Sequence, residues 1–188
     1  ERPDREFLAN KIASHALLDR SNKEESKIGF INEFVLGYFV SINILLNPDW
    51  LNDDLRFLEP AVTSYGPRIS SEKNALLDRI RTSLEFTSIS YRIDFTAKLS
   101  GGVDFPLSSD EAEGLDLDSV ILGSLPINDF QFNDCTFRNC QFMLASMANV
   151  TFLNCKFYGS NAALGTSDGK IYLLGDSGDT AFLREAIQ

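Results

Sequence analysis

The chain has 188 residues, 44% of them hydrophobic and 23% charged, which predicts a soluble globular protein of one domain or two small ones. Its formal net charge of −10 argues against binding to a phosphate backbone or to anionic lipid, because both need a basic surface. No apolar stretch approaches the roughly 20 residues that span a bilayer. The opening Glu1-Arg2-Pro3-Asp4 does not have the basic and then apolar run of a signal peptide, and without an initiator Met we expect an excerpt of a longer protein or a processed chain.

The acidic residues are unevenly distributed along the chain. Residues 1–98 carry 15 acidic and 13 basic side chains, whereas residues 99–188 carry 12 acidic and 4 basic ones. All three cysteines, Cys135, Cys140 and Cys155, lie in the second half. Their odd number favours a reducing, cytoplasmic setting over a disulfide framework.

Four helices are predicted in the first half, at residues 5–20, 24–46, 48–64 and 70–85. In each of them the apolar residues recur at spacings of three and four, and in the second they form a wide stripe. Asn47-Pro48 has the form of an N-cap followed by proline at the first helical position, and Gly66-Pro67 ends the third helix.

The second helix has a resemblance of its own. Its stretch Ile28-Gly29-Phe30-Ile31-Asn32-Glu33-Phe34-Val35-Leu36-Gly37-Tyr38-Phe39 resembles the helical region that follows the nucleotide-binding module in bacterial signal-transduction ATPases of the NACHT and STAND kind. The resemblance, over residues 28–46, implies that this chain is the tail of a larger protein and that its helical part packs on an upstream nucleotide-binding module. A buried amphipathic helix explains the same pattern without that relationship.

A strand and a connector are predicted next. Apolar Ile89, Tyr91, Ile93 and Phe95 alternate with polar residues, which indicates a strand. Residues 99–114 contain Ser100-Gly101-Gly102 and Asp110-Glu111-Ala112-Glu113, and we interpret them as an acidic connector between two domains.

The strongest signal is a five-residue period between residues 115 and 159. Two series, one starting at Leu115 and one at Leu117, are apolar at every fifth position through Cys155 and Phe157. Helices (period 3.6) and strands (period 2) do not sustain such a pattern, whereas a solenoid does. The eighteen apolar positions are Leu115, Val120, Leu125, Phe130, Cys135, Cys140, Ala145, Val150 and Cys155, with Leu117, Leu122, Ile127, Phe132, Phe137, Phe142, Met147, Phe152 and Phe157.

The stretch Asn133-Asp134-Cys135-Thr136-Phe137-Arg138-Asn139-Cys140-Gln141-Phe142 resembles pentapeptide-repeat proteins, with Phe at the centre of the pentad and a small residue two before it. The resemblance implies a right-handed quadrilateral β-helix with four pentads per coil. Residues twenty apart should then stack at one strand spacing, about 4.8 Å: Phe132 on Phe152, Phe137 on Phe157, Cys135 on Cys155. From Leu115 to Phe130 the small position holds large residues, so the first coil should be splayed or covered by what precedes it.

No stretch of the sequence predicts an active site. Gly165-Thr166-Ser167-Asp168-Gly169-Lys170-Ile171 is one residue short of a phosphate-binding loop, and it predicts a turn before a strand at 170–174. Gly175-Asp176-Ser177-Gly178 resembles the nucleophile segment of trypsin-like proteases, but a loop of turn-forming residues explains it better. The cysteines follow the repeat rather than metal-ligand spacing, and His15 has no partner nearby in the sequence. We therefore expect no catalytic, cofactor-binding or metal-binding residues and no cofactor.

The acidic tract, Asp104, Asp110, Glu111, Glu113, Asp116 and Asp118, has no Lys or Arg between Lys98 and Arg138. A solvated face is its ordinary interpretation, and an electronegative contact surface is the functional one. Some pentapeptide-repeat proteins present an acidic rod that resembles duplex DNA to topoisomerases. That function would require a continuous acidic stripe and a dimer joined through the end of the rod.

The sequence thus predicts an α+β chain in three parts: a helical domain at 1–98, the acidic connector at 99–114, and a β-helix with a small cap at 115–188, ending in a helical turn near 180–187. The predicted function is a non-catalytic, cytoplasmic protein–protein interaction or sensor module of a larger bacterial signalling protein, with a protein partner and no direct contact with nucleic acid or membrane. The alternative is a free-standing DNA mimic that binds a topoisomerase. An unmatched apolar patch on the helical domain would favour the first hypothesis.

Overall fold

The computed structural model describes residues 18–19, 29–47, 51, 55–167 and 169–186. They fall into two compact units, residues 1–67 and 68–188. The predicted first helix lies outside the described residues except for its last positions, where β1 (Leu18–Asp19) pairs antiparallel with β2 (Gly29–Phe30). The predicted second helix is therefore shorter than expected, because its first residues include β2.

The first unit is built around α2 (Glu33–Leu46). Asn32 caps this helix, since its side chain accepts a hydrogen bond from the Val35 N–H at 2.9 Å. The face of α2 with Gly37, Val40 and Ile44 is buried against α3 (Leu58–Tyr65), which follows the short 3₁₀ turn η2 (Leu55–Phe57). The two helices cross so closely that a Cβ on Gly37 would lie 1.8 Å from the Pro60 carbonyl oxygen, so only glycine fits there.

The second unit begins with two helices, and one of them corrects the sequence analysis. The predicted fourth helix is confirmed as α4 (Ser70–Leu84), whose buried residues are those expected from its spacing. The predicted strand at 89–95 is wrong, because these residues lie in α5 (Ile89–Ser100). The Ser88 side chain caps the start of α5, and Gly101 ends it in the left-handed region at φ 76°. The alternation that indicated a strand also places Ile89, Ile93 and Ala97 on one helical face.

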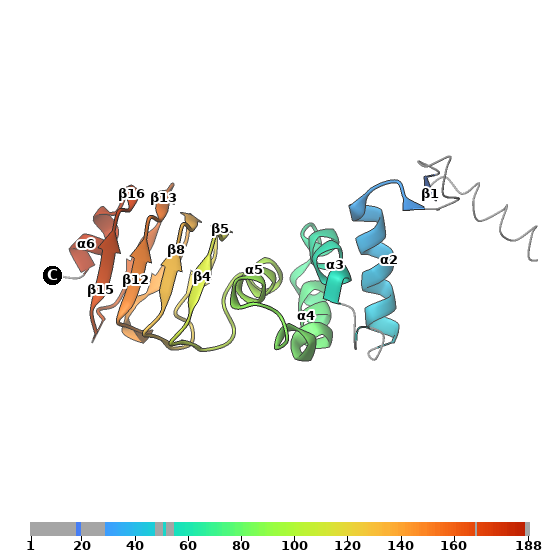
Figure 1. Ribbon diagram of the computed structural model, residues 1–188, viewed down its shortest axis with the longest axis horizontal. Helices are drawn as coiled ribbons and strands as arrows, with labels where there is room; N and C mark the ends of the chain where they lie inside the picture. The colour runs from blue at the N-terminus through green and yellow to red at the C-terminus, as the bar shows by residue number, and fades with distance from the viewer. Residues whose placement is uncertain (1–17, 20–28, 48–50, 52–54, 168, 187–188) are drawn as a thin grey trace, which may run out of the picture. The chain divides into compact units, whose positions relative to one another are not determined.

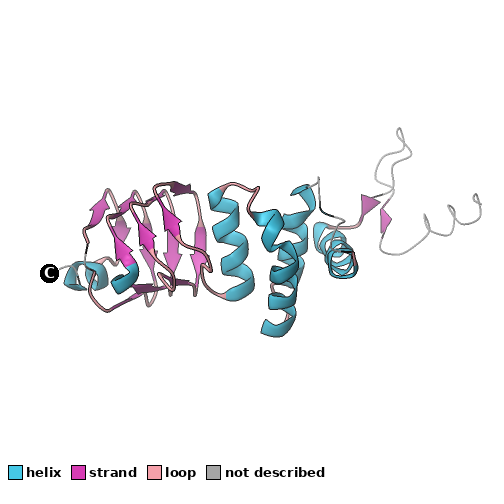
Figure 2. Cartoon of the chain, turned by 90° about the horizontal axis from the view of Figure 1, so that it is seen from below, coloured by secondary structure: helices cyan, strands magenta, loops and turns pink. Residues whose placement is uncertain are grey.

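A parallel β-solenoid of about four turns follows α5. Its strands form four sheets, which we call sides 1 to 4 in chain order, and Figure 1 shows the strands of side 2 next to one another. In Figure 2 the strands of the solenoid are drawn as magenta arrows, and the strands that stack on one side run parallel. The strands are, on side 1, β3 (Leu107–Ser108), β7 (Ile127–Asn128) and β11 (Met147–Ala148); on side 2, β4 (Glu111–Glu113), β8 (Gln131–Asn133), β12 (Val150–Leu153) and β15 (Ile171–Leu174); on side 3, β5 (Asp116–Asp118), β9 (Thr136–Arg138), β13 (Lys156–Tyr158) and β16 (Ser177–Gly178); and on side 4, β6 (Ile121–Leu122), β10 (Gln141–Met143) and β14 (Ala162–Leu164).

The solenoid begins inside the segment that we predicted as a connector. Strands β3 and β4 already occupy residues 107–113, and α4 and α5 belong to the same compact unit as the coils. The expected boundary at 99–114 therefore differs from the observed division at residues 67 and 68. The five-residue period is hidden in this segment. Continued backwards, the series that starts at Leu115 falls on polar Asp110, and the series that starts at Leu117 falls on the small residue Ala112.

Stacked side chains fill the interior of the solenoid, as the twenty-residue rule predicts. Phe132 pairs with Phe152 at a centroid distance of 5.4 Å and 10° between planes, and Phe137 pairs with Phe157 at 5.3 Å and 17°. One extra residue after Phe157 raises the sequence separation of stacked residues from twenty to twenty-one, so that Phe152 lies beside Leu173. The rings contact both their neighbours in the coil and those in the next coil, giving one continuous aromatic core.

Two of the eighteen expected interior positions are wrong. Leu125 and Ala145, both at the corner between sides 4 and 1, are exposed. The chain turns there through the 3₁₀ segment η3 (Leu144–Ser146), which directs Leu144 into the interior instead of Ala145. The other sixteen positions are buried.

The corners follow a periodicity of their own. The central position of a pentad is the one that holds Phe132 or Phe137. The residue two places after it repeatedly has a positive φ, and in each such case it is Ser, Gly, Asp or Asn. These residue types tolerate the left-handed region best. The corner N–H groups of Asp134 and Asn154, for example, donate to carbonyls of the next coil, Leu153 and Leu174. The corners thus satisfy backbone groups that the short strands leave unpaired.

Helices close both ends of the coil stack. At the first coil, Ile93 and Ala97 of α5 join the same buried cluster as Leu115 and Leu117, which explains how the large residues of this coil are covered. At the last coil, α6 (Ala181–Ala186) buries Leu183 and places Phe182 at 5.5 Å from Phe142. The predicted strand at 170–174 and the final helical turn are both confirmed, as β15 and α6.

Candidate functional site

In the two segments that resemble enzyme motifs, residues 165–171 and 175–178, the described residues lie in the last coil of the solenoid. Gly165 and Gly175 occupy corners with positive φ, and Asp176 lies at the corner between sides 2 and 3. The Asp176 Oδ1 atom accepts a hydrogen bond from the Cys155 N–H at 2.6 Å. This hydrogen bond ties two coils together at a corner of the solenoid. His15 lies outside the described residues.

The three cysteines are buried in the coil interior as free thiols. Cys135 and Cys155 are neighbours in successive coils, and the hydrogen bond with the Cys135 thiol, together with burial, raises the pKa of Cys155. Burial also raises the pKa of Cys140. These thiols serve as small apolar fillers of the core. Among the described residues, no group of three or more His, Cys, Asp or Glu side chains is placed to hold a metal ion.

The residues of the acidic tract do not form one stripe. Asp104 pairs with Arg81 at 2.5 Å, while Glu111 and Glu113 lie on side 2 and Asp116 and Asp118 lie on side 3. In the next coil the equivalent outward residues are the amides Gln131 and Asn133 on side 2, and Thr136 and Arg138 on side 3. The outward negative charge of these two sides is thus concentrated in the first coil.

Asp116 and Asp118 have close partners in the structure. Arg138 forms an ion pair with Asp116, and Asn139 and Ser119 donate hydrogen bonds to Asp118. Those hydrogen bonds lower the pKa of Asp118. By contrast, Glu111 and Glu113 form no ion pair with any described residue, although Gln131 donates a hydrogen bond to Glu111 at 3.3 Å.

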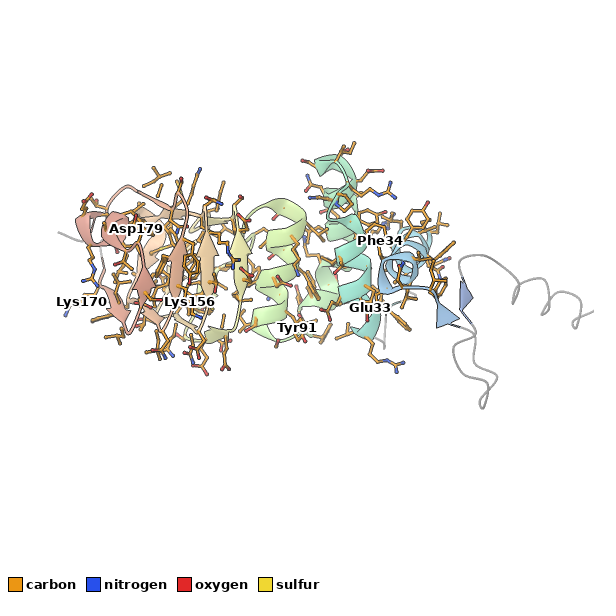
Figure 3. The ribbon with its side chains drawn as sticks, turned by 90° about the horizontal axis from the view of Figure 1, so that it is seen from above. Glu33, Phe34, Tyr91, Lys156, Lys170 and Asp179 are labelled. Atoms are coloured by element: carbon orange, nitrogen blue, oxygen red, sulfur yellow. The ribbon has the colours of Figure 1, made fainter. Side chains whose placement is uncertain are left out.

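An open groove of about 580 Å³ lies between α5 and the first coil. The Ser90 hydroxyl connects its two walls, because it accepts a hydrogen bond from the Glu113 N–H at 3.0 Å. Tyr91, which Figure 3 labels on α5, is 53% exposed beside the groove. The lining residues are Ser90, Tyr91, Asp94 and Lys98 from the helix and Glu113, Gly114, Leu115 and Asp116 from the coil.

Among the described residues of the first unit, exposed apolar side chains gather on the outer face of α2 and on Phe30 and Ile31, which precede it. These large side chains are between 37% and 73% exposed, although the helix has a fully buried opposite face. Phe39 stacks on Phe30 at 5.5 Å and meets Tyr38 edge-on at 5.6 Å, so the rings form a cluster. We call this surface the α2 face; it consists of Phe30, Ile31, Phe34, Tyr38, Phe39 and Leu46. Figure 3 labels Phe34 on it.

The sequence analysis recognised the apolar stripe of α2 but did not divide it into buried and exposed halves. It also missed the groove, because the segment that forms the helical wall was predicted as a strand. The Ser88 and Gly101 caps were the sequence signals that could have identified that helix.

No described helix is long and apolar enough to cross a membrane. Comparisons of the chain with protein-family models, with curated proteins and with solved structures find no match.

Proposed function

We propose that the chain is a non-catalytic protein–protein interaction or sensor module and the C-terminal part of a larger bacterial signalling protein. In this proposal the α2 face packs against an upstream nucleotide-binding module, and the solenoid meets a protein ligand in the cytoplasm. The observation that carries the proposal is the exposure of six large apolar side chains on the α2 face, four of them on the helix itself and two, Phe30 and Ile31, just before it.

The chemistry of the α2 face supports a binding role. Aromatic side chains are enriched in protein interfaces, and their truncation accounts for many of the largest losses of affinity. The Phe39 ring contacts those of Phe30 and Tyr38, so these three rings lose little side-chain entropy on binding. An apolar patch of this kind is typical of a surface that another domain covers.

The solenoid supports the assignment to the pentapeptide-repeat family, which we include in the proposal. The five-residue period, the four sides and the twenty-residue register of Phe132 and Phe152 agree with what the resemblance implies. A solenoid of this kind presents flat faces whose side chains are fixed by the coil stack. Such faces suit recognition, because binding requires little further ordering.

The alternative of a DNA mimic receives less support. The outward acidic residues of sides 2 and 3 give way to Arg138, Lys156 and apolar residues along the coils. In addition, α5 and α6 cover the coil ends through which a rod would dimerise. No described feature favours this function over the interaction module.

Photo-crosslinking tests the proposed role of the α2 face. A benzoyl-phenylalanine placed at Phe34 in the protein expressed from its own gene should crosslink to an upstream nucleotide-binding module. The matched control is the same probe at Phe86, which is 77% exposed in the second unit and outside the α2 face. Crosslinks confined to position 34 and mapped to that module support the proposal, whereas equal yields at both positions contradict it.

A dye-binding measurement gives the complementary result on the purified chain. The double variant Phe34→Ser and Phe39→Ser should lower the fluorescence of a bound hydrophobic dye by more than half, because it removes the centre of the α2 face. The Phe86→Ser variant should leave the signal unchanged. A signal that is the same in both variants would show that the α2 face is not the apolar surface that the dye detects.

A further inference from the structure

Side 2 of the solenoid changes character along its length. Its four strands are in register, so their outward residues form two columns that run from the first coil to the last. Each column begins with a carboxylate, continues with an amide side chain and ends with a large apolar or aromatic one. The columns are Glu111, Gln131, Thr151 and Tyr172, and Glu113, Asn133, Leu153 and Leu174.

The first end of side 2 has negative charge that no described residue neutralises. Within the groove beside it, Lys98 is bound to Asp94 at 2.6 Å, and Asp116 is bound to Arg138. Glu113 lines the same groove without an ion pair, and the half-exposed Tyr91 ring lies on the opposite wall. A carboxylate and an aromatic ring that share an open groove suit a guanidinium, which can bind the first and stack on the second.

The last end of side 2 is apolar and exposed. Tyr172 is 43% and Leu174 51% exposed, and half-buried Leu153 lies beside Leu174 in the neighbouring strand. The helix α6 packs instead on the coil end, against Phe142 and Phe157. The two ends of side 2 are three strand spacings apart, or about 14 Å.

We infer that side 2 binds a segment of a protein partner that carries an arginine or lysine at one end and large apolar side chains about 14 Å away. The basic group would enter the groove between Tyr91 and Glu113, and the apolar side chains would lie on Tyr172 and Leu174. This separation corresponds to about nine residues of helix or about four of extended chain. The inference rests on the proposed function and adds the chemistry of the partner and the surface that recognises it.

Charge complementarity distinguishes this occupant from others. Residues 99–188, which include the solenoid, carry 12 acidic and 4 basic side chains, so a basic segment is attracted to the solenoid before it makes contact. An acidic or uncharged segment would leave Glu111 and Glu113 without a counter-ion. The amides of Gln131 and Asn133, in the middle of side 2, can donate hydrogen bonds to the backbone of the bound segment.

A display library of random 14-residue peptides, selected on the full chain at low salt, tests the inference. Enriched peptides should carry Arg or Lys at one end and Leu, Phe or Trp at the other, and fluorescence anisotropy should measure their affinity. The double variant Glu111→Lys and Glu113→Lys should weaken binding about tenfold or more, and Tyr172→Ser with Leu174→Ser about fivefold. The matched control is Glu185→Lys on α6, an exposed carboxylate that forms no ion pair with any described residue, and it should change affinity less than twofold. All five positions are exposed, and circular dichroism confirms that each variant is folded.

Several results would overturn the inference. These are enrichment of acidic or uncharged peptides, equal affinity for the wild type and both double variants, or no enrichment at all. Peptides whose binding depends on Phe34 and Phe39 but not on side 2 would overturn it as well, while leaving the proposed role of the α2 face intact. Crosslinking from position 34 decides the proposed function independently, so the two failures are distinguishable.

Discussion

The α2 helix and the solenoid coils use the same kind of residue in opposite ways. In the coils, six phenylalanines from Phe130 to Phe157 are almost completely buried, each against rings of its own or the next coil. On α2, Phe34 is 49% and Phe39 43% exposed. A repeat therefore provides its own partner for every interior side chain, whereas a single helix with apolar residues on two faces needs a second partner.

Truncation of one ring in each region should show the largest contrast. Phe137→Ala leaves a cavity in the coil interior and should lower the free energy of unfolding by about 3 to 5 kcal/mol. Phe34→Ala removes a ring from the surface and should change it by no more than about 0.5 kcal/mol. Urea unfolding, followed by hydrogen exchange of peptides from each unit, measures both. Equal losses would contradict the contrast between a closed core and an open face.

A corner substitution tests the backbone of the solenoid instead of its side chains. Asp134 has φ 50°, and its N–H donates to the Leu153 carbonyl at 2.9 Å. Asp134→Val places a β-branched residue in the left-handed region and should cost about 2 kcal/mol. Asp134→Gly is the control, which keeps the same φ without strain and should be close to neutral. Thermal unfolding that ranks the two variants in the reverse order would show that φ does not limit the choice of corner residue.

The smallest expected effect concerns a pair of equivalent corners. Asn161 and Asp176 each accept a hydrogen bond from the N–H of a cysteine in the preceding coil, Cys140 and Cys155. The Asn161 amide also donates to two carbonyls, those of Phe137 and Tyr158, whereas Asp176 has a buried Oδ2 to which no described group donates. Asp176→Asn should therefore stabilise the protein at neutral pH by about 1 kcal/mol.

The same variant should change the dependence of stability on pH. Burial raises the pKa of Asp176 above its value in the unfolded chain. The folded state therefore retains this proton while the unfolded state loses it, so the contribution of Asp176 to the unfolding free energy falls as pH rises through that window. Asp118 has the opposite effect, because hydrogen bonds from Asn139 and Ser119 lower its pKa below the value in the unfolded chain. Its contribution to the unfolding free energy is therefore lost as the pH falls. The difference between wild type and Asp176→Asn isolates Asp176, and it should grow between about pH 4 and neutral pH. A difference that is independent of pH would contradict this assignment.

Sequence alone was enough to predict the coil interior except at Leu125 and Ala145, the stacking of Phe132 on Phe152, the helix at residues 70–84 and the final strand and helix. A strict five-residue period fixes which side chains meet, because each coil repeats the geometry of the one before it. The fold of residues 89–100 was not predicted, because the alternation of Ile89, Tyr91, Ile93 and Phe95 has the period of a strand, whereas these residues form a helix capped by Ser88 and Gly101. Tertiary contacts favour the helix, because it places Ile93 and Ala97 over the large residues of the first coil.

The candidate surfaces depend even more on tertiary structure. The acidic tract and the apolar stripe of α2 could be recognised in the sequence. The sequence does not show, however, which of those carboxylates form ion pairs or which of those apolar side chains are buried. Arg138 reaches Asp116 only because the coil places residues about twenty apart side by side, and this leaves Glu113 as the open carboxylate of the groove. Likewise, only the close crossing at Gly37 assigns one side of α2 to α3 and leaves Phe34 and Phe39 exposed. Composition and period are local properties of a chain, whereas a surface consists of what remains after distant segments have packed.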